Sequence, residues 1–155
     1  MKRPPITRTS VRTIARVALG VALVVAGVAH LTTARNEFQA QVPDWVKLDK
    51  NFVVVASGIV EIALGAALVF IRRRRALVGL AAGLFFIAIF PGNISQYVDG
   101  HNAFGLNSDA ARRNRLIFQP VLVSWAWWST GAWPLITGWW RSRRRGDHTC
   151  PSAEN

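Results

Sequence analysis

Four long apolar segments dominate the sequence and constrain the structure that it can form. They cover residues 14–31, 52–71, 76–94 and 116–136. Each has roughly the 17–25 residues that an α-helix, rising about 1.5 Å per residue, needs to cross about 30 Å of hydrocarbon. Lipid offers no partner to backbone N–H and C=O groups, so segments that span it are helical. The sequence therefore predicts an all-α membrane protein: a bundle of four transmembrane helices over residues 14–136, with tails at 1–13 and 137–155.

The basic residues predict how this bundle is oriented. The chain has 19 Lys and Arg against 8 Asp and Glu, an excess that is also typical of nucleic-acid-binding proteins. Here, however, most of them form short blocks in the N-terminal tail, at Arg72–Arg75 and at Arg143–Arg145, all on one side of the predicted bundle. The positive-inside rule places both termini in the cytoplasm, with Arg16 snorkelling to the interface. We expect this topological role for the blocks, and no nucleic acid as partner; binding of lipid headgroups is the smaller alternative.

Cysteine and histidine are too sparse for several kinds of site. Cys150 is the only cysteine, so the chain can form no internal disulfide and lacks the paired cysteines of membrane thiol oxidases. His30, His101 and His148 fall in three separate regions without metal-ligand spacing. The sequence therefore predicts no metal site and shows no evident cofactor ligands.

One acidic residue, Glu61, lies in the middle of the second apolar segment. Ser57 and Gly65 precede and follow it by four residues and so share its face of a helix. A matching face of the first helix carries small residues and ends in a histidine: Ala18, Ala22, Ala26 and His30. Gly79 and Gly83 form a further pair of small residues on the third helix. Because small residues let membrane helices approach closely, we expect these faces to meet, with Glu61 inside the bundle.

The polar residues near Glu61 admit two interpretations. Asn93 and Gln119 lie toward the ends of the third and fourth helices and can close a polar patch with Glu61 and His30. If the first helix ends at Leu31, His30 lies about 12 Å nearer the outer surface than Glu61, so contact needs a water or a longer first helix. These groups either fix helix packing or form a ligand or proton site, since ionisable groups within membranes are usually functional. Three Trp residues lie deeper in the fourth segment, and they either pack helices or line an apolar pocket: Trp125, Trp127 and Trp128.

Four stretches in order resemble the DoxX-like family of small bacterial membrane proteins. They are GVAHLTTARNEFQAQVPDWV, SGIVEIALGAALV, FPGNISQY and RNRLIFQPVLVSWAWW. The matching positions are Gly27, His30, Val42, Pro43, Ser57, Gly58, Glu61, Phe90, Pro91, Asn93, Arg115 and Gln119. The resemblance covers residues 14–136 and implies a four-helix protein of the bacterial cytoplasmic (inner) membrane. The family's name comes from a subunit of a thiosulfate:quinone oxidoreductase, and other relatives are associated with redox complexes.

Three functions remain as hypotheses. The first is an accessory subunit of a redox or quinone-linked complex, not catalytic on its own. In it a quinone or other small apolar ligand lies among the candidate site residues Ser57, Glu61, His30, Asn93, Arg115 and Gln119, and a partner subunit carries the electrons. The second is a scaffold that recruits a soluble partner through its basic cytoplasmic face. The third is a permease for a small solute or protons. Four helices without an inverted repeat are poorly suited to alternating access, so this function requires the protein to form a homo-oligomer.

Overall fold

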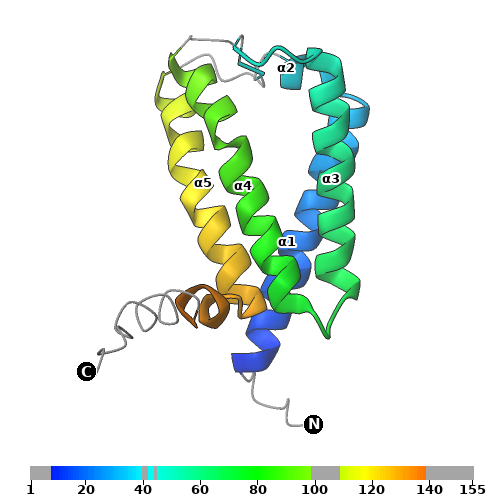
Figure 1. The fold of residues 1–155 in the computed structure, drawn as a ribbon, viewed down its shortest axis with the longest axis vertical. Helices are drawn as coiled ribbons and strands as arrows, with labels where there is room; N and C mark the ends of the chain where they lie inside the picture. Colours follow the sequence, from blue (N-terminus) through cyan, green and yellow to red (C-terminus); the bar gives the residue numbers. More distant parts are fainter. Residues whose placement is uncertain (1–7, 40–41, 44, 99–108, 139–155) are drawn as a thin grey trace, which may run out of the picture.

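Five helices make up the part of the chain that the structure describes. The structure is a computed structural model, and it describes residues 8–39, 42–43, 45–98 and 109–138. The helices, shown in Figure 1, are α1 (Arg8–Leu31), α2 (Arg35–Gln39), α3 (Lys50–Phe70), α4 (Arg75–Val98) and α5 (Asp109–Thr130). No strand occurs among these residues. Three helical stretches are long and apolar enough to cross a membrane: Ser10–Leu31, Lys50–Phe70 and Arg75–Ser95.

Local sequence explains where two of these helices begin and end. α3 begins after Asp49, whose carboxylate accepts a hydrogen bond from the Phe52 N–H at 2.8 Å and so caps the helix. α5 ends at Thr130, short of the predicted end at Ile136. The reason is Gly131, whose φ is 75°. This left-handed backbone conformation ends the helix, and residues other than glycine adopt it only at a cost. The chain then turns, and residues 133–138 are helical again.

Glycines bring α1 and α3 into close antiparallel contact. A Cβ atom at Gly20 would lie 2.7 Å from the Gly65 carbonyl oxygen, and one at Gly27 would lie 2.6 Å from the Gly58 carbonyl oxygen. The predicted small-residue face of α3 is thus in contact, but the alanine face of α1 is not the partner. Ala18 and Ala22 of that face are exposed. Glycines form the contact with α3 instead, because glycine permits a closer approach than alanine.

A second close pair is formed by α4 and α5, again through small residues. A Cβ atom at Gly79 would collide with Thr130, and one at Gly83 would collide with the Trp127 indole. This confirms that Gly79 and Gly83 form a packing surface. It also assigns Trp127 to helix packing, since the indole fills the space that Gly83 leaves open.

The two pairs meet at one end of the bundle and separate toward the other. In Figure 1, α3 and α4 are close at the turn that joins them and diverge toward α2. We call the first the arginine end, because the turn contains Arg72–Arg75, and the second the α2 end. A buried core joins the pairs: Leu19, Leu23, Leu68, Ala82, Phe86 and Ala126. The Trp125 indole also donates to the Ala15 carbonyl oxygen at 3.0 Å.

Arg16 lies inside the arginine end and does not snorkel as predicted. Only 4% of its surface is exposed, and its guanidinium donates to the carbonyl oxygen of Leu68. Leu68 belongs to the last turn of α3, whose carbonyl oxygens receive no hydrogen bond from an N–H of the helix and form its negative end. The positively charged Arg16 side chain therefore caps the C-terminus of α3.

Apolar side chains cover the outside of the bundle and polar ones are gathered inside. Ile14 is 65% exposed and Phe70 is 80% exposed. The buried polar and charged residues are Arg16, His30, Glu61, Asn93, Gln119, Ser129 and Thr130. This distribution is the reverse of a water-soluble protein and agrees with the membrane-spanning character of the helices.

Candidate functional site

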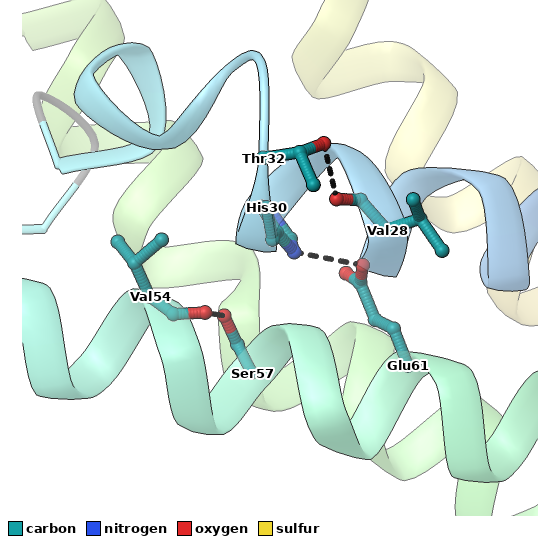
Figure 2. A network of polar contacts seen from close by, with 6 residues as sticks. All are labelled: Val28, His30, Thr32, Val54, Ser57 and Glu61. Atoms are coloured by element: carbon teal, nitrogen blue, oxygen red, sulfur yellow. Dashed lines mark hydrogen bonds and ion pairs between the residues drawn. The ribbon is translucent and has the colours of Figure 1, made fainter.

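His30 and Glu61 form a buried pair between α1 and α3. The His30 Nδ1 and the Glu61 Oε2 are 2.9 Å apart, and the two side chains are 8% and 6% exposed. Figure 2 shows them pointing toward one another across the two helices. The backbone explains this convergence, because the Cα–Cβ bond tilts toward the N-terminus of a helix. In antiparallel helices His30 leans toward the arginine end and Glu61 leans toward the α2 end.

The contact is direct, so neither a water nor a longer α1 is needed to join the pair. The sequence-based separation of about 12 Å assumed that both helices end at one level. Instead, the last residue of α1, Leu31, lies 3.3 Å from the position of a Cβ on Gly58, about two turns into α3. Gly58 also leaves room for His30, whose Cβ would be only 2.8 Å from a Cβ there.

The pair is close but its geometry is not that of an aligned hydrogen bond. Neither His30 Nδ1 nor Glu61 Oε2 has a well-directed hydrogen-bond partner among the described residues, although both atoms are buried. Buried polar atoms are normally hydrogen-bonded, and those that are not call for an explanation, such as a ligand or an ion. Both atoms thus retain hydrogen-bonding capacity.

Asn93 and Gln119 link α4 to α5 with two hydrogen bonds. The Asn93 Nδ2 donates to the Gln119 Oε1 at 3.0 Å, and the Gln119 Nε2 donates to the Phe86 carbonyl oxygen at 2.6 Å. Both amides are buried. Pro91 and Pro120, one on each helix, lie beside them and donate no backbone N–H. The amides thus hold together two helices whose internal hydrogen bonding is interrupted nearby.

A cavity of about 420 Å³ connects the two polar pairs. It lies between α1, α3, α4 and α5 and reaches Phe38 of α2 and the following Val42 and Pro43. Its polar lining residues are His30, Ser57, Glu61, Asn93 and Gln119, and its other walls are largely apolar. This size and lining are typical of sites for small molecules, which combine apolar walls with a few placed polar groups.

Five of the six candidate residues predicted from the sequence line this cavity. Ser57 is one of them, but its hydroxyl donates to the Val54 carbonyl oxygen at 2.9 Å, within its own helix (Figure 2). The sixth, Arg115, belongs to α5 one turn before Gln119, and its side chain lies outside the described part of the chain. His101, His148 and Cys150 also lie outside it. Among the described residues, no three His, Cys, Asp or Glu side chains gather as metal ligands do.

Phe38 is a lining residue in direct contact with His30 that the sequence analysis missed. Its ring packs edge-on against the His30 imidazole and covers the α2 end of the cavity. Val42 and Pro43 are buried beside it. Phe38 belongs to the short α2, whose five residues carry no strong pattern that could have shown this contact in the sequence.

These features define a class: a helical membrane protein with an internal, mostly apolar cavity that contains a buried histidine–glutamate pair. The chain belongs to the family described as Domain of unknown function (DUF8561), which matches residues 19–130. The match begins within α1, ends with the last residue of α5 and includes every residue of both polar pairs. No curated protein and no solved structure matches the chain.

Proposed function

We propose that the cavity binds a small apolar molecule with a hydrogen-bonding head, of the quinone class, and that the protein is an accessory subunit of a redox-linked membrane complex. The observation that carries this proposal is the buried His30–Glu61 pair, which lines a largely apolar cavity and has two polar atoms without well-directed partners. The resemblance to DoxX-like proteins supports the redox context. The catalytic metal or cofactor chemistry belongs to the partner subunit.

The polar groups suit the chemistry of a quinone. Its carbonyl oxygens accept hydrogen bonds, and its reduction to a quinol takes up two electrons and two protons. The electrons come from the partner, because the chain itself has one cysteine and no evident cofactor ligands. His30 and Glu61 offer a donor and a carboxyl group that can pass protons to the carbonyl oxygens. The apolar walls would hold the ring and exclude water.

We further propose that α5 is a fourth transmembrane helix and that both termini are cytoplasmic, in a bacterial inner membrane. α5 begins with the polar DAARRNR, but from Leu116 onward it is apolar and packs along α4. Its Ile117 and Phe118 are more than half exposed, as lipid-facing side chains are. The arginine end contains Arg12, Arg16 and Arg72–Arg75, which supports its cytoplasmic placement by the positive-inside rule.

The test of binding compares three proteins purified in mild detergent: the wild type, Glu61→Gln and Glu37→Gln. Glu37 is the matched control, since it is an exposed acidic residue that does not line the cavity. Native mass spectrometry and solvent extraction measure the quinone retained by each. We expect retention by the wild type and Glu37→Gln, and a loss of at least about tenfold in Glu61→Gln, which corresponds to one hydrogen bond of about 1.4 kcal/mol.

The opposite result is equally clear. Three equally stable proteins that all lack a small molecule, and that take up no added short-chain quinone, would refute the ligand site. His30 and Glu61 would then have a packing role, and the scaffold function of the basic face would be favoured.

A further inference from the structure

A second hollow lies at the arginine end, between α1, α4 and α5. Its volume is about 700 Å³, and it shares no lining residue with the His30–Glu61 cavity. Its walls include Arg12 of α1, Arg75 of α4, and the indoles of Trp127, Trp128 and Trp133. It therefore combines two guanidinium groups with aromatic walls, whereas the polar groups of the cavity are the neutral amides of Asn93 and Gln119, the Ser57 hydroxyl and the His30–Glu61 pair.

Among the described residues, no acidic side chain lines this hollow to balance its positive charge. Arg75 is the first residue of α4, where the helix dipole is positive and the backbone N–H groups have no acceptor within the helix. Neither α1 nor α4 has an acidic residue in its first turn. The acidic residues whose side chains are described lie elsewhere: Glu37, Asp49 and Glu61. An anion is the group that this arrangement lacks.

Arg12 is held at the wall of the hollow by an aromatic ring. Its guanidinium carbon lies 5.8 Å from the centre of the Trp128 ring, within the range of a cation–π contact. The planar guanidinium can donate two parallel hydrogen bonds to the oxygens of a phosphate. The contact with Trp128 thus holds the Arg12 guanidinium in place before a phosphate binds.

The position of the hollow identifies the source of the phosphate. It lies where the apolar helices α1 and α4 begin, and its Trp128 and Trp133 are about half exposed, as in the aromatic belt at a membrane surface. We propose that this hollow binds the headgroup phosphate of an anionic phospholipid, between Arg12 and Arg75, with the indoles against the glycerol and upper acyl chains. Basic pockets between transmembrane helices are a known setting for anionic lipids.

The test measures lipid retained on the intact chain by native mass spectrometry. The protein is titrated in detergent with dioleoylphosphatidylglycerol, with dioleoylphosphatidylcholine and with inorganic phosphate. The variant Arg12→Gln/Arg75→Gln is compared with Arg73→Gln/Arg74→Gln, which removes the same charge from exposed arginines that do not line the hollow. We expect phosphatidylglycerol to bind the wild type and the control pair equally, and the Arg12/Arg75 pair at least about tenfold more weakly.

A further variant separates the pocket from simple charge attraction. Trp128→Leu keeps every arginine but removes the ring that positions Arg12, and we expect it to weaken phosphatidylglycerol binding severalfold. Equal losses in both arginine pairs, or equal retention of phosphatidylcholine by the wild type, would overturn the proposal. If inorganic phosphate binds the hollow as tightly as phosphatidylglycerol does, the proposal that the phosphate belongs to a lipid headgroup is wrong.

Discussion

The close contact of α1 with α3 predicts that Gly65→Ala destabilises the bundle. A Cβ atom at position 65 would lie 2.5 Å from the carbonyl oxygen of Gly20 and 2.9 Å from the backbone nitrogen of Val24. Both atoms belong to the backbone, so no change of rotamer relieves the collision. Bringing the first distance to 3.4 Å requires the helices to separate by about 0.9 Å.

The sign of the effect depends on two opposing terms. Alanine is the better helix former, which favours the variant by about 1 kcal/mol. Overpacking of a tight interface costs about 1–3 kcal/mol. Because the Gly20 carbonyl oxygen and the Val24 nitrogen belong to the backbone, we place the interface term in the upper part of its range, about 2–3 kcal/mol, and expect a net loss of about 1–2 kcal/mol in the free energy of unfolding.

The assay is unfolding by sodium dodecyl sulfate in mixed micelles, followed by circular dichroism. Gly138→Ala is the control, since no heavy atom lies within 4 Å of a Cβ there and only the propensity term applies. It should be neutral or slightly stabilising. A Gly65→Ala protein as stable as the wild type would contradict the close contact of α1 with α3. A change of the unfolding free energy in the same direction for both variants would contradict it as well.

Three further variants test other parts of the structure. Arg16→Leu leaves the Leu68 carbonyl without its donor and should cost about 1–3 kcal/mol of unfolding free energy in the same assay, with partial recovery in Arg16→Lys. Gln119→Leu leaves the buried Asn93 amide without its acceptor and should destabilise by about 1–3 kcal/mol, whereas adding Asn93→Leu should restore part of the loss; a further loss would contradict this. Gly131→Ala should cost about 1 kcal/mol through its positive φ alone, a value that thermal unfolding can check.

The sequence predicted the helical membrane character well, because length and hydropathy decide it locally. Its prediction of a face through Ser57, Glu61 and Gly65 also placed Glu61 inside the bundle, where it is 5% exposed. The face of α1 was predicted in part: His30 pairs with Glu61, but the close backbone contact with α3 is made by glycines and not by the alanines of that face. Only the packed structure selects Gly20 and Gly27.

The level at which the helices meet could not be read from one segment at a time. The glycine contacts set the offset between α1 and α3, and this offset makes the His30–Glu61 pair direct. Arg16 was likewise misplaced because its acceptor, a carbonyl at the end of α3, is distant in sequence. The cover of the cavity by Phe38 depends on the short α2, which has no strong pattern of its own.

The most direct test of the central claim is to locate a bound ligand within the protein. A short-chain quinone that carries a photoreactive diazirine is bound in native membrane vesicles, crosslinked with light and mapped by peptide mass spectrometry. We expect labels on residues that line the cavity, such as Leu23, Val54 and Phe86, and the loss of these labels in Glu61→Gln. Labels confined to lipid-facing side chains such as Val25, or unchanged in Glu61→Gln, would contradict it.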